Sequence, residues 1–131
     1  MLKPTLLLLL LLPPFLALTT AHPDHNPDPP KTWAELHLEQ EHHINNFDPG
    51  AFFTLHDFDS SGTWTHDEVL RFYGLSQPDG TFSEETKSHV WRTILDSIDS
   101  DHNDEVSMGE FLSFSNSGNT LPDFGVCIAP S

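Results

Sequence analysis

Oxygen-bearing side chains recur at short, regular intervals in two segments of the chain, residues 57–68 and residues 99–110. In the first segment these side chains stand at positions 1, 3, 5, 9 and 12, and glycine stands at position 6. Calcium is a large, hard cation that binds six to eight oxygen atoms at about 2.3–2.6 Å. The spacing therefore predicts a loop that folds around a calcium ion.

Each position of the first segment has a predicted role. Asp57, Asp59 and Ser61 supply side-chain oxygens, and Thr63 supplies its backbone carbonyl. Position 9 acts through a water molecule, and Glu68 closes the shell with both carboxylate oxygens. Glycine at position 6 permits the left-handed backbone of the sharp turn. This is the twelve-residue pattern of an EF-hand loop.

The second segment repeats the pattern with one departure. The predicted ligands are the backbone carbonyl of Glu105 and the side chains of Asp99, Asp101, Asn103 and Glu110. Position 6 holds aspartate instead of glycine, and a left-handed backbone costs that residue on the order of 1 kcal/mol. We therefore expect two calcium ions, with the second site weaker than the first.

Helical patterns flank both loops. A shift of 42 residues lays the first loop and its apolar flanks on the second, so the chain contains two copies of one unit. Helices are expected from a capping box at residue 32 to about residue 46, and over residues 49–56, 65–73, 83–98 and 107–114. The predicted fold is all-α, a pair of EF-hands over residues 32–114 with an extra N-terminal helix. Trp64 and Val106 stand at position 8 of the loops and are expected to meet across a short antiparallel bridge.

The charge balance excludes several kinds of partner. The chain has 20 acidic and 5 basic residues, and its formal net charge is -15. Nucleic acids and anionic lipid surfaces are bound by clustered lysine and arginine, so neither is expected here. The single cysteine, Cys127, excludes an intrachain disulfide. No nucleophile elbow, phosphate loop or catalytic pair stands outside the metal loops, so an enzyme is not expected.

The N-terminal segment is typical of a targeting signal. Lys3 precedes a run of seven leucines, and small residues lead up to Ala21. This predicts a signal peptide over residues 1–21, and the run is too short to anchor the chain in a membrane. Residues 22–31 are predicted to be a flexible leader and residues 115–131 a flexible tail. We expect the protein in the lumen of the endoplasmic reticulum or Golgi, or secreted.

Nine histidines in an acidic chain raise the possibility of a zinc site. The densest cluster, residues 37–43, does not follow the His-Glu-x-x-His order of a metalloprotease. His37 and Glu41 share a helix face that is expected to be solvated. His56 aligns with an apolar residue of the second repeat, so a partly buried, hydrogen-bonded histidine is favoured over a pH sensor.

Residues 42–44 and 47–57 resemble the EF-hand region of the nucleobindins. They are more similar still to small fungal secretory EF-hand proteins, and the human multiple coagulation factor deficiency protein is similar in organisation. The resemblance covers roughly residues 22–125, and the fungal proteins continue into a tail rich in histidine and acidic residues. It implies calcium binding in the secretory pathway and, for the small members, association with lectin-type cargo receptors that cycle between endoplasmic reticulum and Golgi.

The preferred function is a lumenal, calcium-dependent adaptor, and the alternative is a calcium buffer without a dedicated partner. Filling the loops relieves repulsion among their carboxylates and reorients the flanking helices. The apolar groove exposed in this way is rich in aromatic side chains instead of methionine, which favours one dedicated partner. Its predicted lining is Phe52, Phe53, Leu55, Phe72, Trp91, Ile94, Leu95, Phe111 and Phe114. For any one of these residues, packing in the core of the EF-hand pair is an equally favoured alternative, and part of the set must pack inward in either case.

Overall fold

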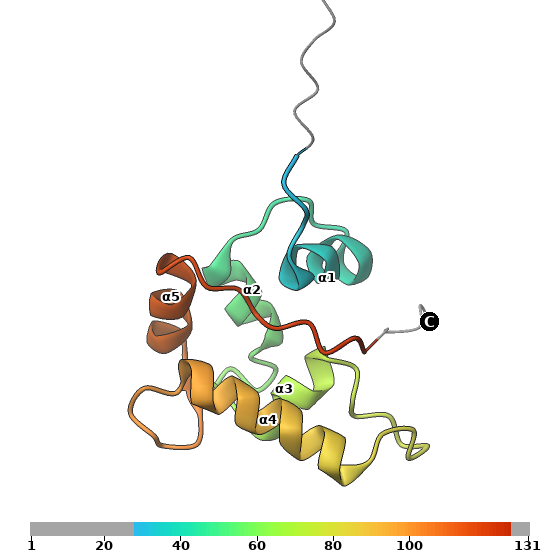
Figure 1. Cartoon of the computed structure of the whole chain (residues 1–131). Coiled ribbons are helices and arrows are strands. Elements are labelled where there is room, and N and C mark those ends of the chain that lie inside the picture. The colour runs from blue at the N-terminus through green and yellow to red at the C-terminus, as the bar shows by residue number, and fades with distance from the viewer. Residues whose placement is uncertain (1–27, 127–131) are drawn as a thin grey trace, which may run out of the picture.

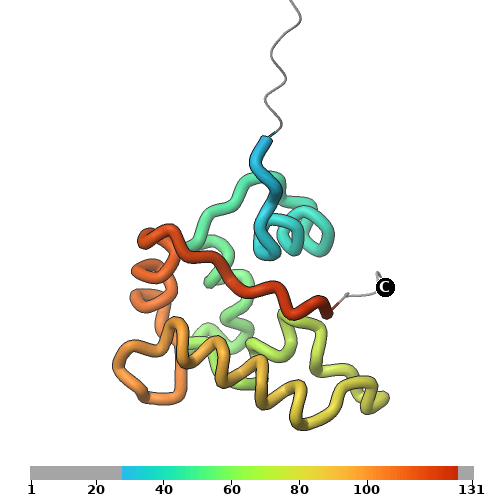
Figure 2. The backbone as a smooth tube through the Cα atoms, in the orientation of Figure 1, coloured from blue at the N-terminus to red at the C-terminus, as the bar shows by residue number. Residues whose placement is uncertain are grey.

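A computed structural model describes residues 28–126, and five helices and one small two-stranded sheet lie within them. Figures 1 and 2 show the course of the chain. The predicted all-α fold needs one correction, because the two loops pair as short strands and the domain is mostly helical instead of purely so. In chain order the elements are α1 (Trp33–His42), α2 (Pro49–His56), β1 (Thr63–Trp64), α3 (His66–Phe72), α4 (Glu84–Ile98), β2 (Val106–Ser107) and α5 (Met108–Asn116).

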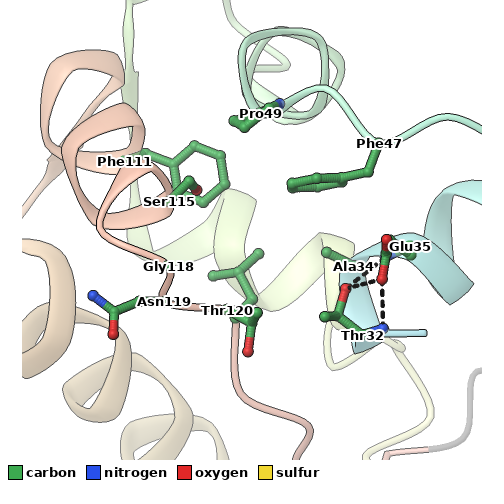
Figure 3. A pocket seen from close by; sticks show the side chains of 11 residues that line it. Thr32, Ala34, Glu35, Phe47, Pro49, Phe111, Ser115, Gly118, Asn119 and Thr120 are labelled. Carbon is green, nitrogen blue, oxygen red and sulfur yellow. Dashed lines mark hydrogen bonds between the residues drawn. The ribbon is translucent and has the colours of Figure 1, made fainter. Parts of the chain in front are cut away.

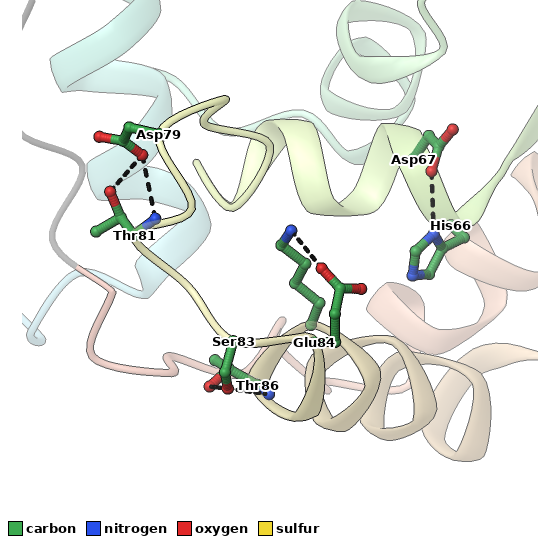
Figure 4. Close-up of polar contacts among 8 residues, drawn as sticks. His66, Asp67, Asp79, Thr81, Ser83, Glu84 and Thr86 are labelled. Atoms are coloured by element: carbon green, nitrogen blue, oxygen red, sulfur yellow. Dashed lines mark hydrogen bonds and ion pairs between the residues drawn. The ribbon is translucent and has the colours of Figure 1, made fainter.

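Side-chain caps explain where the helices begin. The Asp48 carboxylate accepts a hydrogen bond from the Ala51 amide at 2.7 Å, and proline occupies the first position of α2. Ser83 caps α4 by accepting from the Thr86 amide at 3.1 Å, as Figure 4 shows. Capping boxes begin α1, α3 and α5. These caps lie at the positions that the sequence predicts.

The first helix ends four residues earlier than expected. α1 stops at His42, and His43 takes a left-handed backbone with φ of 56°. The Ile44 amide then donates to the Leu38 carbonyl at 3.0 Å, which closes the helix end. Because glycine usually occupies this left-handed position, a histidine there gives no signal in the sequence.

The two loops meet across the small sheet. β1 and β2 pair antiparallel, with Trp64 opposite Val106 and Thr63 opposite Ser107. The predicted bridge at position 8 is therefore confirmed. The Trp64 side chain is fully buried, and its indole N–H donates to the Phe53 carbonyl at 3.1 Å. One core residue thus ties β1 to α2.

Aromatic side chains dominate the core. Trp64 stacks on Phe53 with ring centroids 4.6 Å apart and lies 4.6 Å from Phe111. From α1, Trp33 stacks on Tyr73 at 4.3 Å, so this extra helix covers the EF-hand pair. The residues predicted to line a groove differ in how deeply they are buried. Its buried members are Phe52, Phe53, Phe72, Ile94 and Phe111, its half-buried members are Trp91, Leu95 and Phe114, and Leu55 is exposed.

The chain after α5 runs back across the domain in an extended form. Figures 1 and 2 show this segment passing between α1 and α4. Leu121 is buried, and the Tyr73 hydroxyl donates to the Pro122 carbonyl at 2.9 Å. Phe124 meets Tyr73 edge-on at 5.0 Å. The sequence predicts a flexible tail over residues 115–131. Within the described part of that range, Leu121, Pro122 and Phe124 make these contacts with the core.

The predicted signal peptide and Cys127 lie outside the described residues. Within residues 28–126, no helix combines the length and the apolar character that crossing a membrane requires.

Candidate metal centres

The first loop draws its carboxylates together. Oxygen atoms of Asp57, Asp59 and Glu68 lie within 4.8 Å of one another. The Ser61 hydroxyl lies 3.0 Å from the Thr63 carbonyl oxygen, so the predicted ligands at positions 5 and 7 are also neighbours. The structure thus brings three of the five predicted ligands together and places the other two beside each other.

Backbone amides hold the first carboxylate of the loop in place. The Asp57 side chain accepts from the amides of Ser61 and Gly62, each at 2.9 Å. Gly62 reaches this position with φ of 84°. The closing Glu68 points one oxygen at the Thr65 amide, 3.0 Å away, and the other at the Asp59 amide, 3.2 Å away. Its carboxylate therefore caps α3 and faces the loop at the same time.

The second loop repeats this arrangement. Oxygen atoms of Asp99, Asp101 and Glu110 lie within 4.8 Å of one another. The Asn103 amide donates to Asp99 and to Asp101, each at 3.2 Å. The Asn103 side-chain oxygen accepts from the Glu105 amide at 2.9 Å, which brings positions 5 and 7 together.

Glu110 closes the second loop, and hydrogen bonds keep it ionised. Burial acts to raise its pKa, but bonds donated by Ser107, Asp101 and Ser100 outweigh burial and lower the pKa to about 2. Charge from Glu110 adds to loss of hydration in raising the pKa of Asp101. Close carboxylates of this kind repel one another, and a bound cation relieves that repulsion.

Position 6 is where the two loops differ. Asp104 adopts φ of 62° in the second loop, where the first has glycine. Its amide still donates to the Asp99 carboxylate, at 3.0 Å. A β-carbon added to Gly62 would meet no atom within 4 Å, so the first loop has space for a β-carbon at position 6. The energetic cost at Asp104 therefore comes from its left-handed backbone.

The donor set fits calcium. Each loop offers three carboxylates, a further polar side chain and a backbone carbonyl, and calcium prefers such oxygen ligands. Together with two helices around each loop and a bridge between the loops, this defines a paired EF-hand protein of the calcium-binding class.

The chain belongs to the family described as SSP120-like, EF-hand pair, which matches residues 33–112. It is similar to an uncharacterized calcium-binding protein, C613.03, of Schizosaccharomyces pombe, with 34% identity over 93 residues. It is also similar to Protein SSP120 of Saccharomyces cerevisiae, with 31% identity over 109 residues. No solved structure matches the chain.

These alignments cover 71% and 72% of this chain but only 49% and 47% of the two relatives. The chain thus spans about half the length of the curated relatives that it matches. The family and the first relative's name support calcium binding, and neither relative's name describes an enzyme. The resemblance to nucleobindins and to the human multiple coagulation factor deficiency protein stays a prediction.

A third cluster of metal-binding side chains lies outside the loops. The ring nitrogens of His37, His42 and His56 lie within 4.8 Å of one another. His37 is only 7% exposed, whereas the sequence placed it on a solvated face. His56 is buried as expected, and its ring lies against Phe52. No local spacing signals this cluster, because it joins residues of two different helices.

Burial also changes the acidity of two of these rings. Loss of hydration lowers the pKa of His37 to about 4, and the neighbouring His42 adds to this effect. Loss of hydration likewise lowers the pKa of His56 to about 4, against the opposing effect of its hydrogen bond to the Phe52 carbonyl. Both rings are therefore neutral at neutral pH.

Proposed function

We propose that this protein is a calcium-dependent adaptor of the secretory pathway, with one calcium ion in each loop. The two carboxylate clusters support two ions, and the N-terminal leucine run supports entry into the secretory lumen. The resemblance to secretory EF-hand proteins favours a lectin-type cargo receptor as the partner.

A direct link between the second loop and an apolar hollow carries the adaptor proposal. Glu110 closes the loop, and the next residue, Phe111, is buried and lines a hollow of about 320 Å³ (Figure 3). Phe47 from the α1–α2 connection and Leu121 from the C-terminal segment line the same hollow. A calcium ion that moves Glu110 moves Phe111 with it, so loop filling changes the hollow's shape.

The buffer is the second candidate, and the packing of the core favours it. Most of the aromatic side chains expected to line a groove are already buried against one another, with α1 and residues 119–126 packed over them. Buffer EF-hands barely open when calcium binds. The two functions thus differ in whether calcium exposes apolar surface.

Dye fluorescence and partner capture distinguish the adaptor from the buffer. We expect an apolar-surface dye to bind more in calcium than in EGTA. We also expect calcium to promote capture of a cargo-receptor lumenal domain. Ser115 lines the hollow, so Ser115→Trp should block it and abolish capture, whereas Ser113→Trp, at an exposed position of α5, should not. Equal dye binding in both conditions, with no release by EGTA, would support the buffer.

N-terminal sequencing tests the predicted localisation. The secreted or lumenal form is expected to begin at His22. An intact Met1 on the product purified from its host would contradict signal cleavage.

A further inference from the structure

Three imidazole rings converge where α1 and α2 end. The Nε2 atom of His56 lies 3.0 Å from Nε2 of His37 and 3.3 Å from Nε2 of His42. His37 is in the middle of α1, His42 is its last residue, and His56 is the last residue of α2. We propose that these three histidines form a binding site for a zinc-type divalent transition-metal ion, separate from the two calcium loops.

The spacing of the nitrogens suits tetrahedral coordination. A zinc ion bound to imidazole at about 2.0–2.1 Å in tetrahedral geometry holds its ligand nitrogens about 3.3 Å apart. The two separations from His56, 3.0 and 3.3 Å, lie close to that value. The ring nitrogens of the third pair, His37 and His42, lie within 4.8 Å of each other, so an ion would draw three nearby nitrogens together.

Hydrogen bonding alone satisfies this cluster poorly. The Nδ1 atom of His56 lies 2.7 Å from the Phe52 carbonyl, which can only accept, so Nδ1 carries the proton and Nε2 is bare. A bare ring nitrogen has one in-plane lone pair, yet two other ring nitrogens approach it. The hydrogen bonds from His37 and His42 therefore compete for one lone pair of His56. A cation would instead accept one lone pair from each of the three rings.

The surroundings of His56 match what metal-binding histidines require, and those of His37 match in part. The bond from His56 to the Phe52 carbonyl sets the ring's tautomer and orientation, as backbone carbonyls do for many zinc ligands. His37 stacks on Trp33 with ring centroids 5.0 Å apart, which restricts its rotation. The Nδ1 atom of His37 is buried and has no hydrogen-bond partner among residues 28–126. Of the two buried rings, only His56 is therefore held by a hydrogen bond at the nitrogen that would not bind the ion.

The site has a route to solvent and a place for a fourth ligand. His42 is only half-buried, and all three histidines line a hollow of about 240 Å³. Glu41 and Gln77 line the same hollow and offer acceptors to a water molecule bound to the ion. Nitrogen ligands suit zinc, copper and nickel, while calcium prefers oxygen, so the site is selective against the ion of the loops.

An ion here would fasten the extra helix to the EF-hand pair. It would link residues 14 and 19 positions apart in the sequence, across the contact between α1 and α2. Because the folded state presents the three nitrogens together and the unfolded chain does not, zinc binding stabilises the fold. This role does not depend on whether the protein is an adaptor or a buffer.

Zinc titration of the full chain in saturating calcium tests the proposal. The predicted leader contains His22 and His25, so all variants carry alanine at both positions to remove background binding. We expect one zinc ion per chain, with affinity reduced at least about tenfold by His42→Gln. The matched control is His43→Asn, which changes the adjacent, exposed histidine and tolerates its left-handed backbone.

Cobalt provides a second measurement that does not depend on variant stability. Cobalt bound by three imidazoles and a water in tetrahedral geometry absorbs strongly in the visible region, and the octahedral ion absorbs weakly. We expect strong absorption in the parent chain and in His43→Asn, and its loss in His42→Gln. Equal zinc affinity in the two variants, or only weak cobalt absorption in the parent chain, would overturn the proposal.

Discussion

The two calcium loops share one hydrogen-bond framework but reach it with different residues at position 6. In each loop the amide at position 6 donates to the second oxygen of the first aspartate, at 2.9 Å in loop 57–68 and 3.0 Å in loop 99–110. In each, the closing glutamate caps the following helix. Gly62 takes the left-handed backbone freely, and Asp104 takes it at a cost. The difference between the sites is therefore expected to be one of affinity.

The largest expected effect comes from removing each closing carboxylate in turn. Glu68→Gln and Glu110→Gln should each reduce calorimetric stoichiometry from two ions to one at calcium levels that fill both parent sites. Glutamine keeps an oxygen that can cap the helix but loses the charge and the two-oxygen contact. We expect at least about thirtyfold weaker binding at the altered loop, or 2 kcal/mol.

The site that remains in each variant makes the comparison direct. In both variants the remaining ion binds beside an empty loop. Any influence of one loop on calcium binding at the other is therefore similar in the two variants. The ion left in Glu110→Gln occupies loop 57–68 and should bind more tightly than the ion left in Glu68→Gln. A tighter remaining site in Glu68→Gln would reverse the predicted ranking.

A smaller effect is expected from exchanging the residues at position 6. Asp104→Gly should tighten the second site by at most about fivefold, since left-handed strain contributes about 1 kcal/mol and the greater freedom of glycine offsets part of it. Gly62→Asp should weaken the first site by no more than a similar factor, because a β-carbon there meets no atom within 4 Å and the left-handed backbone resists the change. Calorimetry on each variant measures both changes.

Charge is the confounding factor in that exchange, and a third variant isolates it. Asp104→Asn removes the charge but keeps a side chain that tolerates the left-handed region. If Asp104→Asn tightened the second site as much as Asp104→Gly does, strain would not be the cause of the difference between the loops.

The loops were predictable because their information is local. Ligands, caps and the glycine position all lie within twelve residues, so spacing alone indicates them. The bridge between Trp64 and Val106 followed from the repeat, since equal positions in two copies meet about a pseudo-twofold axis. These features need no knowledge of how distant segments pack.

The features that sequence reasoning missed depend on contacts between distant segments. His37 becomes buried only because α1 packs on α2, and its closest ring nitrogen belongs to a residue 19 positions away. Leu121 and Phe124 contact the core without helical or strand periodicity. The early end of α1 depends on a left-handed histidine that no glycine signals. Local patterns carry no information about these three features.

The smallest expected effect lies at position 4, where the two loops hold different residues with the same φ angle. Ser60 and His102 both adopt φ of 58°. Ser60→Gly and His102→Gly each relieve left-handed strain of about 1 kcal/mol and add a similar entropy to the unfolded chain, so the net change in unfolding free energy should be within about 0.5 kcal/mol. Because backbone geometry is the same, the two variants should also agree with each other. Denaturant unfolding in calcium measures both values. If the Ser60→Gly and His102→Gly variants differed from each other by much more than about 0.5 kcal/mol, the same φ angle would have different energetic costs in the two loops. Left-handed strain at Asp104 could then not be the origin of the difference in calcium affinity.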